Sequence, residues 1–284
     1  MNKYLVYYNY FNDVNYNYKA DETFELEQRK DPDKLSAKLY DAFYHQFFET
    51  IYKSPNRKIK INIRSYQKYD KATKTTEFGY SYYAITASQP YEQKHILSID
   101  YIGPSIHWAK EIAEFNNEEI KSMLETSRTL GGHIVWERGL PAGKKTVNQA
   151  KGGECNNGLW DRFDWTLLIL KKWYNIPGNH KINKKKNQIK KELNEQYFLA
   201  EDEIKRIEGL IDAFENSKNW FARFDDFNEF TDFFKLKGSF VDDDYNVVEL
   251  TEFSPMKPKK NGYRRYIENS LNAIANRNKI LEQE

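Results

Sequence analysis

Patterns typical of β-strands occur mainly before Gly103 in this chain of 284 residues, and long amphipathic helix patterns occur mainly after it. Residues 58–65 alternate between polar or cationic and apolar side chains, as a half-buried strand does. The runs 75–86 and 95–101, together with the aromatic run 4–10, predict further strands. Because the strands precede the helices instead of alternating with them, the order predicts an α+β fold, with a single mixed or antiparallel sheet covered by helices and a helical C-terminal half.

Apolar residues recur at helical spacing through much of the chain. The first such segment is 36–52, which Ser36 can cap. The turn Gly103-Pro104-Ser105 leads into another helical stretch, and 175–191 is interpreted as an exposed basic loop running into a helix. Further amphipathic helices are predicted at 117–128, 202–216, 221–236 and 263–281. Five phenylalanines at helical spacing in the third of these are interpreted as core: Phe224, Phe227, Phe230, Phe233 and Phe234.

Two segments near the C-terminus bear on domain organisation. Residues 240–253 predict an extended piece that a turn at Asp242-Asp243-Asp244 interrupts. The segment Pro255-Met256-Lys257-Pro258 is the best linker candidate. The sequence therefore predicts one α+β domain over 1–254 and a C-terminal helix within 255–284, which packs on this domain or on a partner protein.

Composition limits the function classes. Aromatic residues make up 16% of the chain and bury large areas, which disfavours disorder. The formal net charge is only +2, so any attraction for nucleic acid must come from local patches. The chain shows neither a signal-peptide pattern nor a run of about 18 apolar residues, and no membrane association is expected. The one cysteine, Cys155, fits a reducing compartment, and a cytoplasmic location is expected.

Glycines and unusual polar residues concentrate in 128–174. The patterns there predict a strand at 132–136, a glycine- and proline-rich turn, a short second strand at 145–148, a glycine loop, and a helix opened by Asp161. Core packing does not require several polar residues of this stretch, which are the candidates for function: Arg128, His133, Glu137, Arg138, Asn148, Lys151, Asp161, Arg162 and Asp164.

His133 and Glu137 form the first candidate pair. They are four residues apart on the predicted strand and therefore lie on the same side of it. A histidine and a carboxylate on one face can act as a general acid and base. The alternative is a structural histidine beside a glycine pair. Metal binding is not expected, because no HxxxH, CxxC or clustered carboxylate signature is present, and the sequence leaves any cofactor unknown.

The second candidate is the segment 146–153, in which a predicted strand leads into Gly152 and Gly153 beside Lys151. Exposed backbone amides and a lysine charge suit an anion, although the segment matches neither GxxxxGK[ST] nor GxGxxG. Arg162, one residue into the predicted helix, is expected to be free to reach a phosphate or carboxylate. Asp161, followed by Asp164 three residues later, has helix capping as its alternative role.

Lysines are also dense in 181–191, where six of them occur. They are candidates for contacts with phosphates. A solvated lysine surface is the alternative.

The central stretch also resembles a family pattern. The runs GGHIVW, TVNQAKGG and DRFDWTLLILKKWY, followed by FDDFNEFTDFFKL, are similar to an uncharacterised bacterial family whose pattern reads roughly GG, TIN-x-ARG, DRFDLTL and a final basic helix ending in Tyr. The likeness covers roughly 105–253 and implies no mechanism. Lys151 stands at the arginine of TIN-x-ARG, which keeps the charge and loses the bidentate geometry. In that family the position of His133 is not always histidine, so the resemblance favours a site built from Asn148, Lys151, Asp161, Arg162 and Asp164.

Three functional hypotheses follow. The first is a nucleotide- or RNA-directed enzyme of transferase or nuclease type, such as a toxin-like or phage-defence effector. Its catalytic candidates are Asp161, Asp164, His133 and Glu137, and its substrate-binding candidates are Arg128, Asn148, Lys151 and Arg162. The second is a non-enzymatic module that binds nucleic acid or protein. The third is a structural or regulatory protein that binds a partner through its C-terminal helix.

Overall fold

The computed structural model describes residues 59–70, 75–88, 91–127, 129–138, 143–152, 158–177, 182–222 and 224–282. The strand predicted at 4–10 and the helix predicted at 36–52 lie outside these residues, as does Arg128.

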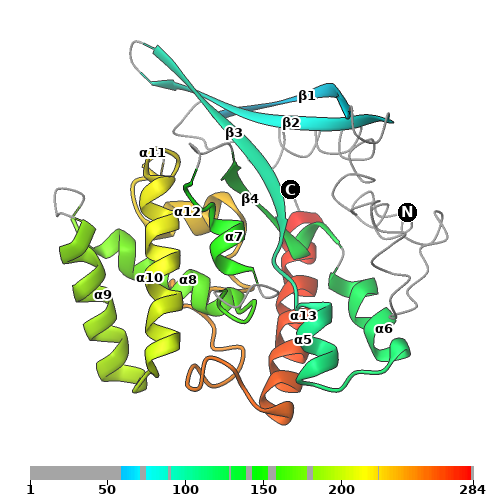
Figure 1. Ribbon diagram of the computed structural model, residues 1–284, viewed down its shortest axis with the longest axis vertical. Coiled ribbons are helices and arrows are strands. Elements are labelled where there is room, and N and C mark those ends of the chain that lie inside the picture. The colour runs from blue at the N-terminus through cyan, green and yellow to red at the C-terminus, as the bar shows by residue number, and fades with distance from the viewer. Residues whose placement is uncertain are drawn as a thin grey trace.

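Four strands form one antiparallel sheet: β1 (Ile59–Asp70), β2 (Thr75–Ser88), β3 (Tyr91–Tyr101) and β4 (His133–Arg138). Their spatial order is β1-β2-β3-β4. The first half of β3 pairs with β2, and its second half pairs with β4. Figure 1 shows the consequence, because β1 and β2 extend beyond the helices whereas β3 runs down into them. The last residues of β3 are thereby delivered to the helical part.

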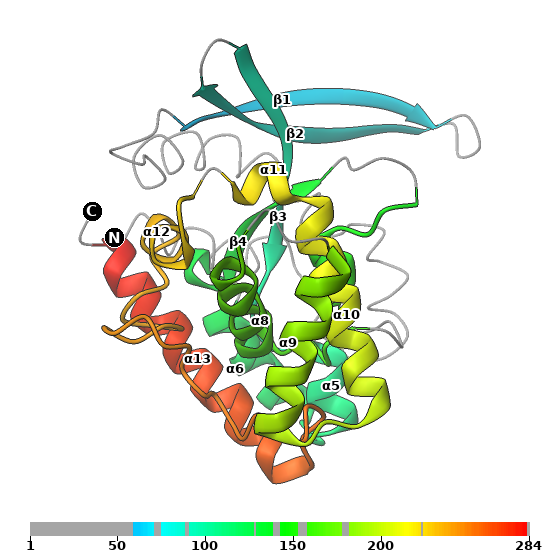
Figure 2. The same cartoon turned by 90° about the vertical axis from the view of Figure 1, so that its left-hand side faces the viewer.

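The helices follow mainly in the C-terminal half, and the predicted α+β fold with an antiparallel sheet is confirmed. They are α5 (Ile106–Glu111), α6 (Asn117–Ser127), α7 (Val147–Lys151), α8 (Phe163–Asn175), α9 (Ile182–Tyr197), α10 (Glu201–Asn216), α11 (Lys218–Phe221), α12 (Phe227–Phe233) and α13 (Lys260–Glu282), with a 3-10 turn η1 (Leu130–Gly132). Figures 1 and 2 both place α8 between the α9–α10 pair and α13. None of the helices in the described part is long and apolar enough to cross a membrane.

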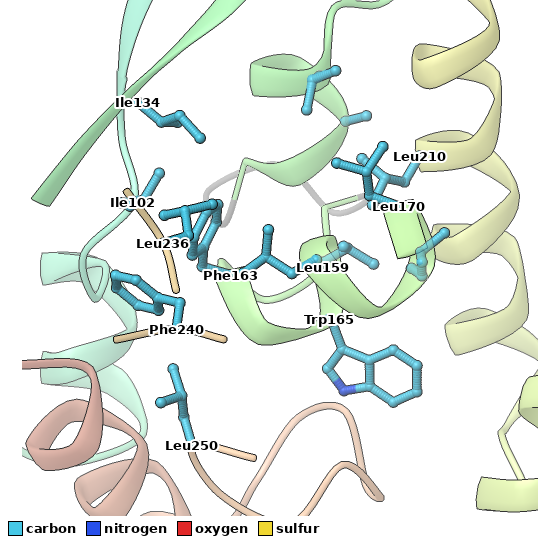
Figure 3. Packing of buried hydrophobic residues seen from close by; sticks show 14 of the residues in the cluster. Ile102, Ile134, Leu159, Phe163, Trp165, Leu170, Leu210, Leu236, Phe240 and Leu250 are labelled. Carbon is cyan, nitrogen blue, oxygen red and sulfur yellow. The ribbon is translucent and has the colours of Figure 1, made fainter. Parts of the chain in front are cut away.

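Helix α8 is central because it is apolar on nearly all sides, and most of its residues are buried. In Figure 3, Phe163 and Leu159 lie between the side chains of Ile102 and Ile134 on one side and Leu170 and Leu210 on the other. Each such side chain contributes about 1.5–3 kcal/mol when it is fully buried. The sheet end and the helices therefore share one hydrophobic cluster.

Two predictions in the central stretch are wrong. Residues 145–148 form no strand, because Thr146 caps α7, accepting from the backbone N–H of Gln149 while the Gln149 side chain accepts from the N–H of Thr146. This reciprocal capping box outweighs the strand preference of so short a run. The next helix does not open at Asp161 either. It begins at Phe163, with Arg162 at the N-cap and no side-chain cap bond.

The helix predicted at 221–236 is shorter in the structure, because α11 ends at Phe221 and α12 covers only Phe227–Phe233. Asp226 caps α12 by accepting from the N–H of Glu229, so the chain must turn between the two helices. The five phenylalanines of this region are nevertheless all buried, as predicted.

Residues 240–253 contain isolated bridges and no strand. The turn predicted at Asp242-Asp243-Asp244 is present, because the Asp242 carboxylate accepts from the N–H groups of Asp244 and Asn246. The predicted linker is packed into the protein, since Met256 and Pro258 are buried. Helix α13 continues this packing and lies against α5, α6 and η1.

Candidate functional site

A lysine and two aspartates meet inside the protein, where β3, α7 and the turn before α8 come together. The ammonium Nζ of Lys151 lies 2.9 Å from Oδ1 of Asp161 and 3.5 Å from Oδ2 of Asp100. It also donates to the carbonyl oxygen of Tyr101 at 2.8 Å. All three charged residues are buried. We call Asp100, Lys151 and Asp161 the lysine–aspartate cluster.

Backbone geometry holds this cluster together. Lys151 is the last residue of α7, and its carbonyl accepts from the N–H of Leu159 at 3.2 Å. Gly158 makes this approach possible, because a Cβ there would lie 1.4 Å from the carbonyl oxygen of Gly152. The chain then passes through Trp160 and Asp161 with φ angles of 52° and 54°. Two successive left-handed residues that are not glycine cost conformational energy, and such strain concentrates at functional sites.

Helix α13 secures the strained turn. The hydroxyl of Tyr266 donates to the carbonyl oxygen of Asp161 at 2.9 Å and accepts from the N–H of Phe163 at 3.1 Å. The Tyr266 ring is fully buried, and burial raises the pKa of its hydroxyl, so it remains a neutral donor. The position of Asp161 thus depends on a residue more than a hundred positions later in the chain.

The charges in the lysine–aspartate cluster do not balance. The pKa of Asp100 is raised to about 6, mainly by burial and also by the charge of Asp161, whereas Lys151 and the indole of Trp136 lower it. The Trp136 Nε1 donates to Oδ2 of Asp100 at 2.8 Å, across adjacent strands of the same sheet face. Burial lowers the pKa of Lys151, but the two aspartates outweigh it and the net shift is upward. One ammonium therefore serves two carboxylates, and Asp100 can exchange a proton near neutral pH.

Arg162 and Asp164 form a separate buried pair. The arginine donates from Nε to Oδ1 at 2.8 Å and from Nη2 to Oδ2 at 2.6 Å, and it also points hydrogen-bond donors at carbonyls of the segment 251–256. Its side chain is fully buried. The expectation that Arg162 is free to reach a ligand is therefore wrong, because its guanidinium N–H groups already donate to the carboxylate of Asp164 and to backbone oxygens.

The expected role of Asp161 as a helix cap is also wrong. The residue precedes the N-cap, and its side chain accepts from Lys151 instead of from a helix N–H. Asp164 lies in the first turn of α8 and accepts from the N–H of Trp165 at 2.9 Å.

His133 and Glu137 lie on the face of β4 opposite to Ile134 and Trp136, so strand alternation directs them away from Asp100. Residues four apart along a strand are separated by about 13 Å, which is too far for direct proton transfer. His133 is buried, and its Nδ1 lies 2.7 Å from the carbonyl oxygen of Thr129. The structure thus does not bring the predicted acid–base pair together. Asn148 lies half-buried on α7.

Sequence reasoning missed Asp100, Trp136 and Tyr266. The signal for Asp100 is a lone aspartate in the apolar strand pattern HILSIDY, because a charge in a buried strand needs a partner. The partner itself could not be identified from spacing.

Much of the lysine run 181–191 is ion-paired or buried. Lys186 pairs with Asp212 and Lys190 with Glu208, both on α10. The Lys185 ammonium lies 4.2 Å from the ring centroid of Trp173 and is buried. The two ion pairs join α9 to α10, the Lys185 contact joins α9 to α8, and all three occupy charges that a phosphate would need.

Among the described residues, no group of three His, Cys, Asp or Glu side chains is arranged to hold a metal ion.

Comparison with known families bears on the resemblance of the central stretch. A model described as "Family of unknown function (DUF6994)" matches residues 12–198 and 198–281. The chain belongs to this family. The match extends well beyond the central stretch and takes in the sheet, the helices and α13. No curated protein and no solved structure matches the chain. The predicted resemblance to an uncharacterised family is thereby confirmed.

Proposed function

We propose that the protein is an enzyme that acts on a nucleotide or on RNA, with proton transfer at the lysine–aspartate cluster. The observation that carries this proposal is the sharing of one ammonium by two buried carboxylates. An unbalanced buried charge costs stability, and groups with strongly shifted pKa values concentrate at functional sites. The left-handed backbone at Trp160 and Asp161 lies at the same place and adds to the support.

Asp161 is the residue that touches the substrate in this proposal. Its side chain is 11% exposed, compared with 5% for Asp100 and 3% for Lys151. In this role its carboxylate removes a proton from an attacking hydroxyl or water, which is general base catalysis. Lys151 holds it in place, and Asp100 adjusts the charge of the cluster through its own proton.

Two cations that lie against the ring of Trp160 support an anionic substrate. The guanidinium carbon of Arg206 lies 3.8 Å from the ring centroid of Trp160, and the ammonium of Lys257 lies 4.4 Å from it. Trp160 directly precedes Asp161 in the chain. Lys151 cannot attract an anionic substrate in this way, because Asp100 and Asp161 already neutralise its charge.

The test is turnover of total RNA, of NAD and of common nucleotides by the purified protein. Asp161→Asn should lower the rate by at least about 100-fold, because an amide cannot accept the proton. The matched control is Asp243→Asn, which makes the same chemical change at an exposed position and should leave the rate unchanged. An Asp161→Asn protein with a normal melting temperature and full activity would refute the proposal.

A non-enzymatic binding module is the second candidate. The observation that favours it is that the charged atoms of the cluster all have partners inside the protein, as in a purely structural ion network. This function predicts that RNA or nucleotide binds without being turned over. Expression in growing cells, with the Asp161→Asn variant alongside, tests the toxin-like or phage-defence role by whether only the unaltered protein stops growth.

A further inference from the structure

Four side chains from distant segments meet at Trp160, the residue before Asp161 in the chain. The rings of Trp108, in α5, and Trp160 lie edge to face, with centroids 4.9 Å apart. The ammonium of Lys257 lies 4.9 Å from the centroid of Trp108 and 4.4 Å from that of Trp160. The guanidinium of Arg206, in α10, lies 3.8 Å from Trp160. We call these four residues the tryptophan–cation cluster.

The tryptophan–cation cluster contains hydrogen-bond donors that have no acceptor. Within the described part of the chain, the Nε1 atoms of Trp108 and Trp160 and the Nε of Arg206 are buried without a hydrogen-bond partner. Trp108 and Arg206 are each only 7% exposed. Buried donors without acceptors are rare in folded proteins, and three in adjoining side chains call for a common explanation. A ligand that carries several acceptor atoms supplies one.

Positive charge accompanies these donors. Lys257 is exposed and has no carboxylate within ion-pair distance among the described residues. The nearest paired acid to Arg206 is Asp202, whose Oδ2 lies 4.0 Å from Nε, too far for a hydrogen bond. The neighbouring carboxylate of Glu203 accepts from the N–H groups of Ala200 and Met256. The Nη1 of Arg206 donates to the carbonyl oxygen of Gly158, so the tryptophan–cation cluster offers two cations and, among the described residues, three buried N–H groups without a partner.

We propose that the tryptophan–cation cluster binds a phosphate group of the substrate. This inference rests on the proposed function, since it places the phosphate of a nucleotide or of an RNA end beside Asp161. Phosphate carries several acceptor oxygens and a negative charge, and both arginine and lysine bind it through charge-assisted hydrogen bonds. Lys257 covers both rings with a flexible exposed side chain. In this proposal the phosphate oxygens accept from the Lys257 ammonium and from the indole N–H groups.

Calorimetric titration tests this site with inorganic phosphate, AMP, adenosine and an RNA oligomer with or without a 5′-phosphate. Inorganic phosphate and AMP should bind, and adenosine should not. Tighter binding of the 5′-phosphorylated oligomer than of AMP assigns the phosphate to an RNA end, and the reverse assigns it to a free nucleotide. Lys257→Gln should raise the Kd about tenfold, as expected for the loss of one charge-assisted hydrogen bond. The matched control is Lys259→Gln, which removes the same charge at an exposed position two residues away.

The indole N–H signals in a ¹H–¹⁵N spectrum give a second readout. Those of Trp108 and Trp160, assigned with the variants Trp108→Phe and Trp160→Phe, should move when AMP is added. Equal binding of adenosine and AMP, or equal weakening by both lysine variants, would overturn the phosphate site. Asp161→Asn should bind AMP at least as tightly as the unaltered protein. If Asp161→Asn loses turnover while Lys257→Gln binds AMP normally, only the phosphate site is refuted. If Asp161→Asn keeps turnover while Lys257→Gln binds AMP weakly, only the proposed catalytic role of Asp161 is refuted.

Discussion

Replacing Asp100 by asparagine should stabilise the protein at neutral pH. The pKa of this buried carboxyl is raised from 3.8 to about 6, first by burial and also by Asp161, so the folded protein binds the proton more tightly than the unfolded chain does. Between these two pH values the free energy of unfolding therefore falls as the pH rises, and above about pH 6 the loss is complete. A shift of this size corresponds to about 3 kcal/mol. Asparagine resembles the protonated acid, keeps an acceptor for the Trp136 indole, and leaves Lys151 paired with Asp161.

Urea unfolding followed by tryptophan fluorescence at a series of pH values measures this effect. The free energy of unfolding of Asp100→Asn minus that of the unaltered protein should be near zero at pH 4. It should grow by about 1.4 kcal/mol per pH unit and level off above pH 6, at up to about 3 kcal/mol. The exposed replacement Asp243→Asn serves as control and should produce no such rise. The reasoning fails if Asp100→Asn is less stable than the unaltered protein at pH 7, or if the difference does not change with pH.

Two further predictions concern stability. Arg162→Lys should lower the free energy of unfolding by about 3 kcal/mol, because lysine keeps the charge but cannot make the buried bidentate contact with Asp164. The control Arg265→Lys, at an exposed ion pair with Glu252, should change the free energy of unfolding by less than about 1 kcal/mol. Comparable losses in urea unfolding would contradict the assigned role of Arg162. Gly158→Ala should lower the melting temperature strongly, since its Cβ would lie 1.4 Å from a backbone oxygen, whereas Gly209→Ala, with open space in α10, should raise it slightly. A Gly158→Ala protein that melts normally would show that Lys151 and Asp161 do not depend on this close approach.

The spacing of apolar residues and the strand propensity of short runs predicted most of the described strands and helices. Strands β1, β2 and β3 overlap the runs predicted at 58–65, 75–86 and 95–101, of which the first was predicted from alternation. Helices α6, α10 and α13 appear where apolar residues recur at helical spacing. The misplaced elements are short. Part of α7 was mistaken for a strand because five residues carry too little periodicity. The start of α12 at Phe227 instead of near 221 is marked by a single capping aspartate, Asp226.

The candidate site was predicted in part. Lys151, Asp161, Arg162 and Asp164 were identified as polar residues that core packing does not require, and all four are buried charges in the structure. Their roles were assigned from local chemistry, in which an aspartate before an apolar helix is a cap and an arginine in a first turn is free. Burial reversed both assignments, because a charge removed from water must find an opposite charge regardless of its distance along the chain.

Sequence by itself determined the α+β class, the aromatic core and the stretch in which the charged residues concentrate, because these follow from side-chain periods of two and 3.6 and from apolar content. Only the tertiary structure decided that Asp100, from β3, shares the ammonium of Lys151 with Asp161, and that Tyr266 of α13 holds the turn between them. It also decided that Lys257, in an apparent linker, lies over Trp108 and Trp160. Electrostatic partners are set by proximity in space and by exclusion of water, and neither quantity is encoded in the spacing of residues along one strand or helix.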